Sequence, residues 1–408
     1  MSEKTLILLT KQFPYQQREQ YVAHELEYLA KSFDKVLIYP HDHFGKGEKY
    51  SFSLPTNVEV IDLNNKVIPA AKVEVIKSFL GAFFYEFFRT HSKVWLLRNM
   101  RRFFAIYATQ FALGKGLKNF LEQRKIDQKH VVFYSYWFSA SALCLAILKS
   151  ENKISRFVSR AHALDLYHED WGLLNVKVRV LPFRNFKQKY VNVIYSISKH
   201  GKDYLDKKFP SIEKVEIAYL GVKDAGLNPS QQENVFVLAT CSGIDDNKRI
   251  HLLGEALSVL DKPVRWIHFG DGPLKEKALN SIHAKNVEFI LKGQTPNEEI
   301  RKFYSMHHID LFVNLSRVEG LPVTIMEALS HGIPVLATDA NGTPEAVLEG
   351  VTGKLISVHF EATDLENALL KLMNDTSRLQ AMRESSRNLF LEKFDANRNY
   401  AVFGNGLA

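Results

Sequence analysis

The most informative part of the sequence is Ser316-Arg-Val-Glu-Gly-Leu-Pro-Val-Thr-Ile-Met-Glu-Ala-Leu-Ser-His-Gly-Ile-Pro-Val-Leu-Ala-Thr-Asp-Ala-Asn-Gly-Thr-Pro-Glu345. Apolar residues just before it, at 311–314, and within it, at 333–338, are typical of buried strands. Pro322 suits the first position of a helix, and Gly332 suits the residue just after its C-terminus. The stretch therefore predicts strand, loop, helix and strand, which is a unit of a parallel sheet.

The same alternation of strands and helices runs along the whole chain. Strands are predicted at 6–10, 36–39, 131–134, 156–159 and 193–197, and again at 235–240, 265–269, 287–291, 311–314 and 333–338. In the second half, helices are predicted at 252–260, 274–282, 298–306, 322–330 and 344–349. A polar, turn-rich segment from Gly221 to Glu233 separates the two series. We therefore predict two doubly wound α/β domains.

Length, composition and cysteine content narrow the class further. The chain has 408 residues, of which 46% are hydrophobic, enough for two or three domains of about 100–200 residues each. Its two cysteines, Cys144 and Cys241, form no CxxC motif, so a disulfide framework is not expected and a reducing compartment is favoured. The N-terminus lacks a signal-peptide pattern, and no apolar run reaches the roughly 20 residues of a spanning helix. Nothing is expected to cross a membrane.

Two carboxylates flank the predicted helix start. Gly320 and the free N–H groups there form the kind of site that binds phosphate. Glu319 precedes this site, and Glu327 lies roughly 7–8 Å beyond Pro322 at about 1.5 Å per residue. Each carboxylate can accept hydrogen bonds from a diol. A nucleotide sugar presents sugar hydroxyls, diphosphate and ribose hydroxyls in that order, and Thr343-Pro344 predicts a second helix start beside the first.

Together these residues resemble the retaining glycosyltransferase family 4. The resemblance rests on Glu319, seven residues and Glu327, followed by Ala-Leu-Ser-His-Gly-Ile-Pro-Val and Asn-Gly-Thr-Pro-Glu. It extends to His268-Phe-Gly-Asp-Gly-Pro and to Gly350-Val-Thr-Gly353. It covers residues 235–360 strongly and the first half of the chain weakly.

The resemblance implies the GT-B fold, in which two Rossmann-like, doubly wound domains face each other across a cleft. It also implies the division of the chain. We expect acceptor binding in 1–222, nucleotide-sugar binding in 223–385, and a C-terminal helix in 386–408 that returns to the first domain.

The resemblance assigns roles residue by residue. Glu319 would hold donor-sugar hydroxyls, Glu327 would hold the ribose, and Lys248 would neutralise the diphosphate. A cation is needed there because the leaving nucleotide diphosphate gains negative charge. Further donor contacts are expected from Gly320, Leu321, Pro322, Val323, Gly270, Gly342 and Thr343.

Two features of the family pattern are missing. The family usually has an arginine five residues before Lys248, where this chain has Gly243. We expect Arg249 to substitute, with a plain solvated charge at a helix start as the alternative. The family's glycine pair in the first loop is absent as well. Arg18 is the candidate for supplying charge in that loop, and a solvated surface arginine is again the alternative.

In the first half, His162 matches a family histidine near the 6-position of the donor sugar, and we place it with the catalytic residues. A satisfied structural histidine is the competing interpretation. Arg160 is expected to reach the diphosphate, and Asp165 to contact the acceptor or a loop. Tyr136 and Trp137 end a strand at the edge where open α/β sheets bind ligands. Whether these two aromatic residues belong to the core or to the cleft stays open.

The expected reaction follows from the same residues. A covalent route would need a carboxylate nucleophile, and none is indicated in the first half. The resemblance implies a same-face reaction in which the donor phosphate takes the proton of the acceptor. The sequence contains no Asp-x-Asp, and the resemblance implies neither a metal nor another cofactor.

The positive charge of the chain is concentrated in one segment. Residues 77–125 hold ten Lys and Arg and two Glu, a difference that equals the whole net charge of +8. Apolar residues at helical spacing, in 80–88 and in 96–111, are accompanied by Arg98, Arg101 and Arg102 on the far side of the second helix. This pattern is typical of helices at an anionic membrane surface. Packing of the apolar faces into their own domain is the alternative, and no nucleic acid is expected as a partner.

We therefore expect a retaining, metal-independent glycosyltransferase. It would move a sugar from a nucleotide diphosphate donor, UDP rather than GDP, to a glycan acceptor that is lipid-linked. The expected setting is surface polysaccharide or glycoprotein glycan assembly in the cytoplasm, at the inner face of the cell membrane. The alternatives are a GT-B sugar-nucleotide epimerase or phosphorylase, and a non-catalytic protein of the same fold that binds membranes or glycans.

Overall fold

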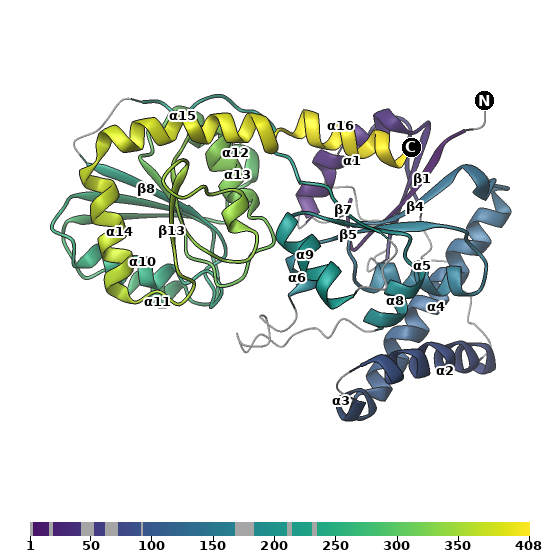
Figure 1. Ribbon diagram of the computed structural model, residues 1–408. Helices are drawn as coiled ribbons and strands as arrows, with labels where there is room; N and C mark the ends of the chain where they lie inside the picture. Colours follow the sequence, from purple (N-terminus) through teal and green to yellow (C-terminus); the bar gives the residue numbers. More distant parts are fainter. Residues whose placement is uncertain are drawn as a thin grey trace.

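The computed structural model describes residues 3–15, 19–41, 53–61, 72–90, 93–167, 183–209, 214–230 and 235–408. It contains two parallel sheets, each flanked by helices on both faces (Figure 1). The predicted architecture of two doubly wound α/β domains is confirmed.

The N-terminal sheet has seven strands in the order β3-β2-β1-β4-β5-β6-β7. Alternate residues of the interior strand β1 (Thr5–Thr10) serve different cores, because Leu6 and Leu8 face one cluster while Ile7 and Leu9 face the other. The sheet is therefore buried on both faces. Its strands are β1 (Thr5–Thr10), β2 (Lys35–Pro40), β3 (Val58–Val60), β4 (Val131–Ser135), β5 (Phe157–Ala161), β6 (Val193–Ser196) and β7 (Val215–Ile217).

The C-terminal sheet has six strands in the order β10-β9-β8-β11-β12-β13, which repeats the order of the first six strands of the other sheet. The chain reverses direction across the sheet between β8 and β11, and ligands bind at such a switch point in open α/β sheets. The strands are β8 (Phe236–Cys241), β9 (Val264–Phe269), β10 (Val287–Gly293), β11 (Leu311–Asn314), β12 (Val335–Thr338) and β13 (Gly353–Ile356).

Helices connect the strands on both sides. In the N-terminal domain they are α1 (Gln20–Ser32), α2 (Lys72–Arg89), α3 (Lys93–Arg98), α4 (Met100–Gln123), η2 (Gln128–His130), α5 (Ala140–Ser150), α6 (Ala163–Leu166), α8 (Arg184–Tyr190) and α9 (Lys199–Lys208). In the C-terminal part they are α10 (Ile250–Ser258), α11 (Lys275–Leu279), α12 (Asn297–Met306), α13 (Val323–Ser330), η3 (Thr343–Glu345), α14 (Ala362–Asn374), α15 (Thr376–Lys393) and α16 (Ala396–Leu407).

Two segments cross between the domains side by side. The linker residue Val222 exchanges main-chain hydrogen bonds with Phe394 and Ala396, at the junction of α15 and α16. A Cβ on Gly221 would lie 2.4 Å from Ala396 Cα, so only glycine allows this approach. Beyond the crossing, α16 packs on α1 (Figure 1). The expected division at residue 386 falls inside α15.

The sequence missed or misassigned short elements only. The strands β3, β7 and β13 were not predicted, because each has three or four residues and lies at or near a sheet edge. The helix predicted at 344–349 is wrong: only the three-residue turn η3 forms there. The chain then turns through Gly350, which has a φ of 75°, directly into β13.

None of the helices in the described ranges is both long and apolar enough to cross a bilayer.

Candidate active site

The loop between β11 and α13 carries Glu319 and Gly320 to the boundary between the domains. A Cβ on Gly320 would lie 3.0 Å from the main-chain nitrogen of Ala163, at the start of α6. A Cβ on Gly342 would lie 1.8 Å from the carbonyl oxygen of Gly320, so the η3 loop packs directly against this loop. The two glycines therefore let a pair of C-terminal loops meet the N-terminal domain beside His162.

The helix α13 starts where the sequence suggests a phosphate site. Pro322 is its N-cap, and its carbonyl accepts the N–H groups of Ile325 and Met326. The amides of the first turn are those that a helix leaves without internal partners, and they carry its positive dipole end. At the other end, Gly332 has a φ of 68°, as a residue that follows a helix C-terminus often does.

Glu319 and Lys248 form an ion pair across this site. The distance from Lys248 Nζ to Glu319 Oε1 is 2.5 Å, and both side chains remain partly exposed, at 24% and 12%. Lys248 lies in the loop after β8, where its main-chain N–H donates to Asp245 Oδ1. The structure thus brings together, from two separate loops, the two groups predicted to hold the sugar and the diphosphate.

Asn247 fixes the relative position of these two loops, and sequence reasoning missed it. Its side-chain amide donates to the carbonyl of Val318 at 3.2 Å and accepts from the N–H of the same residue at 3.0 Å. Its own carbonyl accepts from the N–H of Arg317. A buried asparagine between two polar stretches has no sequence signature, so only the paired loops reveal it.

Glu327 is buried on α13. Its Oε1 accepts a hydrogen bond of 2.5 Å from Asn297 Nδ2, and Arg301 in turn donates to the side-chain oxygen of Asn297. Burial raises the pKa of Glu327 to about 7, and the hydrogen bond from Asn297 and the charge of Arg301 oppose that shift. In the absence of a ligand, this buried carboxyl group therefore titrates near neutral pH.

Arg249 does not replace the missing family arginine. Its guanidinium donates to the main-chain carbonyls of Leu315, Ser316 and Val358. Burial lowers the pKa of Arg249 to about 10. Because its donors are committed to these carbonyls, Arg249 fastens the loop after β11 and does not reach toward a donor.

His162 lies beside the contact between the domains. Its ring packs against Trp137, with 4.5 Å between ring centroids, and against Tyr136 at 5.1 Å. Burial, followed by the charge of Arg160, lowers the pKa of His162 to about 3, so the imidazole is neutral. The main chain of Tyr136 holds one ring nitrogen, whereas Nε2 is buried without a hydrogen-bond partner in the described residues. An unpaired buried nitrogen of this kind is suited to a substrate hydroxyl.

Tyr136 and Trp137 are both buried, and they form the wall behind this histidine. Asp165 has a structural role in the same loop. Its carboxylate accepts from the N–H of His162 at 3.1 Å and closes a capping box at the start of α6. It therefore orients the histidine loop.

Arg160 is a correction to the sequence interpretation, because its side chain is fully buried under α16 and α1. Its guanidinium pairs with Glu25 at 3.1 Å, donates to the hydroxyl of Tyr134 and the carbonyl of Ala218, and lies over the ring of Phe403. With these partners it cannot reach a diphosphate.

The loop between β1 and α1 is built around the carboxylate of Glu19. This carboxylate accepts from the N–H groups of Gln12 and Phe13 at 2.7 and 2.8 Å, and from Trp137 Nε1 at 2.7 Å. Backbone amides of this loop thus bind a carboxylate of the chain itself. Arg18 lies outside the described residues.

The remaining predicted donor contacts lie in tight loops. A Cβ on Gly270 would lie 1.9 Å from the carbonyl oxygen of Ser242, so this glycine is required by packing between the ends of β8 and β9. Leu321 is buried in a hydrophobic cluster that also includes Ile197 of the other domain. Thr343 does not cap a helix, and its hydroxyl is buried without a partner in the described residues.

Glu345, the last residue of η3, connects the two domains. Its carboxylate accepts from the N–H groups of Lys199 and His200, both at 2.8 Å, at the start of α9.

The structure divides the predicted basic, aromatic segment. Arg98, Arg101 and Arg102 are exposed, but Phe83, Phe103, Tyr107 and Phe111 are buried in the N-terminal core. The apolar face predicted for α4 therefore packs mainly into its own domain. The described residues contain no group of three or more His, Cys, Asp or Glu that could hold a metal.

Comparison with known proteins identifies the second half of the chain. Residues 228–389 match the model of the family Glycosyl transferases group 1. An uncharacterized glycosyltransferase of Methanocaldococcus jannaschii is 26% identical over 278 residues, which are 68% of this chain and 74% of the relative. A Vi polysaccharide biosynthesis protein of Salmonella typhi is 21% identical over 315 residues, 71% of this chain and 52% of the relative.

Solved structures share the fold over the full length. The lipopolysaccharide outer core galactosyltransferase WaaB has a TM-score of 0.67 at 13% identity, covering 99% of this chain and 98% of that one. HepE from Anabaena, in complex with UDP, has a TM-score of 0.65 at 17% identity, covering 99% and 97%. The family match is confined to residues 228–389, and the solved structures show that both halves of the chain have the GT-B fold.

Proposed function

We propose that this glycosyltransferase uses a nucleotide diphosphate sugar, with UDP as the nucleotide, and transfers the sugar with retention of its anomeric configuration. The observation that carries the proposal is the ion pair of Glu319 and Lys248 at the start of α13, beside the contact of Gly320 with Ala163. It joins a hydroxyl acceptor, a cation and a helix N-terminus at one point. The UDP bound to HepE, which shares the fold, supports the choice of nucleotide.

The donor would lie along the β11–α13 loop. Glu319 would accept hydroxyl groups of the sugar, while the N–H groups of Gly320, Leu321 and Val323 and the ammonium of Lys248 would meet the diphosphate. Glu327, held by Asn297, would accept the two ribose hydroxyls. In this arrangement the diphosphate takes the place of Glu319 as the main partner of Lys248.

The residues then act by position and charge. The bond between the anomeric carbon and the donor oxygen breaks, and the nucleotide diphosphate leaves with the negative charge that Lys248 stabilises. The acceptor oxygen attacks on the same face and gives its proton to the departing phosphate oxygen. Neutral His162 would accept a hydrogen bond from a sugar hydroxyl at Nε2, because its other nitrogen is held by Tyr136. We propose that no metal is needed.

The acceptor is proposed to be a glycan on a lipid carrier, in bacterial surface polysaccharide or glycoprotein glycan assembly. The Vi polysaccharide relative supports the polysaccharide setting. The exposed Arg98, Arg101 and Arg102 support contact with an anionic membrane, at its inner face. The N-terminal domain, 1–222, would bind the acceptor, and 223–385 would bind the donor.

A thermal-shift panel of UDP-, GDP- and ADP-sugars tests the donor, since a ligand at 100 times its Kd stabilises the fold by about 2.7 kcal/mol. NMR analysis of the anomeric configuration of the product tests retention. Glu319→Ala is expected to abolish transfer, whereas Glu349→Ala, which removes a similar ion pair with Lys354, serves as the matched control. Turnover of donor alone to another sugar nucleotide, or a need for free phosphate, would contradict glycosyl transfer.

A further inference from the structure

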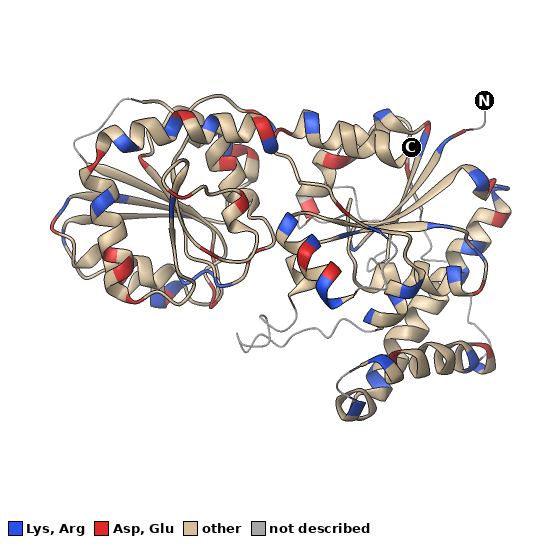
Figure 2. Cartoon of the chain, viewed as in Figure 1, with Lys and Arg blue, Asp and Glu red and all other residues tan. Residues whose placement is uncertain are grey.

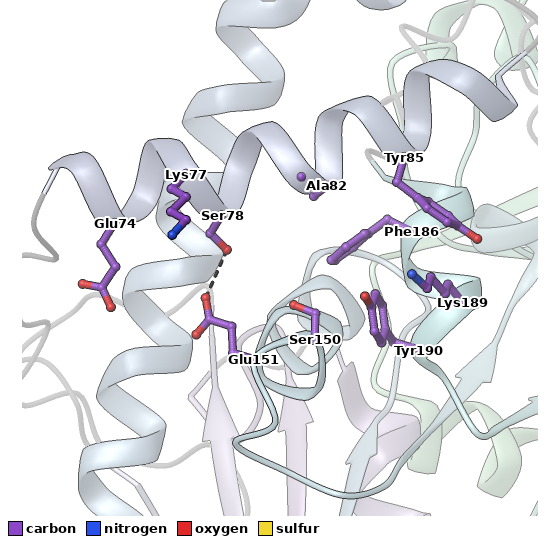
Figure 3. Close-up of a pocket in the computed structure, with 11 residues that line it drawn as sticks. Glu74, Lys77, Ser78, Ala82, Tyr85, Ser150, Glu151, Phe186, Lys189 and Tyr190 are labelled. Carbon is purple, nitrogen blue, oxygen red and sulfur yellow. Dashed lines mark hydrogen bonds between the residues drawn. The ribbon is translucent and has the colours of Figure 1, made fainter.

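The helix α2 buries one face and leaves the other exposed. Its buried residues are Val75, Phe79, Ala82, Phe83 and Glu86, which lie toward the N-terminal core. Figure 3 shows Ser78 and Tyr85 extending from α2 toward Glu151 and Phe186, across a groove that separates this helix from the body of the domain. These contacts show which side of α2 faces the rest of the domain.

The opposite side of α2 carries an exposed apolar stripe, and the exposed Lys77 falls within its arc. The stripe consists of Val73, Ile76, Leu80, Phe84 and Phe88, which are 43% to 78% exposed. On a wheel of about 100° per residue the five positions span an arc of roughly 120°, and they extend over about 22 Å at about 1.5 Å per residue. Further exposed apolar residues follow in the sequence on α3 and at the start of α4, namely Val94, Trp95, Leu97 and Met100.

Exposed aromatic and aliphatic residues gathered on one helical face require a covering partner, because a contiguous apolar patch of this kind is uncommon on a free surface. Along the stripe, the rings of Phe84 and Phe88 stack with their centroids 6.5 Å apart, and each also contacts the phenylalanine that precedes it in the chain. The charge around the patch indicates what the partner is.

The charged residues next to the stripe are basic. Figure 2 shows Lys and Arg on α3 and near both ends of α2. Arg98, Arg101 and Arg102 form no ion pair in the part of the chain that the structure describes. The two acidic residues of α2 are already engaged: Glu86 is buried and accepts from Asn185, and Glu74 pairs with Lys115 at 2.9 Å. The local field is therefore positive.

We propose that α2 and α3 dock on an anionic lipid bilayer, with the stripe of Val73, Ile76, Leu80, Phe84 and Phe88 inserted at the level of the acyl chains. The inference rests on the membrane contact included in the proposed function and names the inserting element. The sequence expectation included apolar faces in both 80–88 and 96–111, and the structure leaves an exposed stripe on α2 while α4 buries Phe103, Tyr107 and Phe111. An apolar face bordered by cations matches the interface between acyl chains and anionic headgroups. Figure 1 shows α2 and α3 projecting from the N-terminal domain, away from the C-terminal sheet.

Co-sedimentation of the full chain with vesicles of phosphatidylcholine, with or without phosphatidylglycerol, tests the proposal. The wild-type chain is expected to bind the vesicles that contain phosphatidylglycerol. The triple variant Leu80→Ser, Phe84→Ser, Phe88→Ser should lose about tenfold or more in partitioning, because apolar burial contributes most of the binding. The control variant Leu391→Ser, Val402→Ser removes residues that are 44% and 69% exposed on α15 and α16, and it should bind like wild type.

A fluorescent label reports insertion directly. Phe84→Cys carrying an environment-sensitive dye should show a blue shift with anionic vesicles, and Val402→Cys carrying the same dye should not. Circular dichroism and turnover of a soluble acceptor check that each variant is folded and active. Binding that is lost with Arg98→Ala, Arg101→Ala and Arg102→Ala but kept by the triple serine variant would overturn insertion while leaving surface contact intact. Self-association of the wild-type chain through the stripe, or no vesicle binding at all, would also overturn it, and neither result would bear on sugar transfer.

Discussion

Two ion pairs of the same chemical kind have opposite surroundings in this molecule. Arg160 and Glu25 are both fully buried, and the guanidinium has further partners in Tyr134 and Ala218. Lys248 and Glu319 are partly exposed, and Glu319 is the acidic partner of that ammonium in the described residues. Arg160 and Lys248 were both expected to meet the donor diphosphate. Only Lys248 has a place from which it could do so.

The difference shows how a cation is made available. A buried arginine bound to carbonyls and a carboxylate is held by several partners, and a ligand would have to displace them all. A lysine with one solvated partner can exchange it for a diphosphate at small cost, because an exposed ion pair contributes only about 0–1 kcal/mol. Availability therefore depends on how many partners a cation already has and how deeply it is buried.

The largest expected effect is on stability, at Arg160. Arg160→Met should lower the free energy of unfolding by about 3–5 kcal/mol, because it leaves the Glu25 carboxylate buried without its partner. Urea denaturation measures this effect. The double variant Arg160→Met, Glu25→Leu removes both charges and should recover most of the loss. If Arg160→Met kept its stability and lost donor binding instead, Arg160 would be a ligand of the donor.

The second prediction concerns catalysis, at Lys248. Lys248→Ala should reduce kcat about 10²- to 10³-fold, because the charge on the leaving diphosphate loses a preorganised cation. The stability should change little, since the ion pair is partly exposed. Steady-state kinetics and a thermal melt measure the two quantities on the same sample. Lys354→Ala, from the exposed pair with Glu349, is the control that should change neither.

A smaller effect is expected at Asn247, which touches neither the sugar nor the phosphate in the proposed arrangement. Asn247→Ala should reduce kcat about 10- to 100-fold, because the loops that carry Lys248 and Glu319 lose their common clamp. Asn247→Asp keeps the oxygen that accepts from Val318 but loses the amide donor, so its kcat should lie between that of the wild type and that of Asn247→Ala. An unchanged kcat in both variants would show that the loops keep their positions without this clamp.

The partners and the burial of a side chain also explain what the sequence could and could not predict. The alternating strands, the loop from Glu319 to Pro322 and the cap at Gly332 follow from local patterns, so most of the C-terminal half was predicted, except β13 and the turn η3. Arg160 and Arg249 were assigned to the donor because a sequence shows that an arginine is present but not which carbonyls bind it. The buried clamps of Asn247 and Glu19 depend on contacts between loops that are distant in sequence.

The apolar segment around α2 shows a related limit. Helical spacing predicted amphipathic helices correctly, but it did not show which side of α2 is buried. Phe83 and Phe84 are neighbours in the chain, and yet the side chain of Phe83 is 5% exposed and that of Phe84 is 52% exposed. The orientation of a helix that is apolar on much of its circumference is decided by the domain it packs on. Periodicity alone cannot give it.

The smallest expected effect is a pH dependence at a third carboxylate, Glu327. This residue is buried like Glu25, but no arginine contacts it directly in the described residues. Burial raises its pKa to about 7. Because this pKa lies above that of the same group in an unfolded chain, the folded state binds more protons between about pH 4.5 and 7, and the unfolding free energy of the free enzyme should fall as the pH rises through that window.

Donor binding should have the opposite dependence on pH. If the ribose is held by the ionised carboxylate, the apparent Kd should be about tenfold weaker at pH 6 than at pH 8, in proportion to the ionised fraction. Calorimetric titration at constant ionic strength measures it, and Glu327→Gln should bind more weakly at every pH without this dependence. A wild-type Kd that does not change from pH 6 to pH 8 would place the ribose elsewhere.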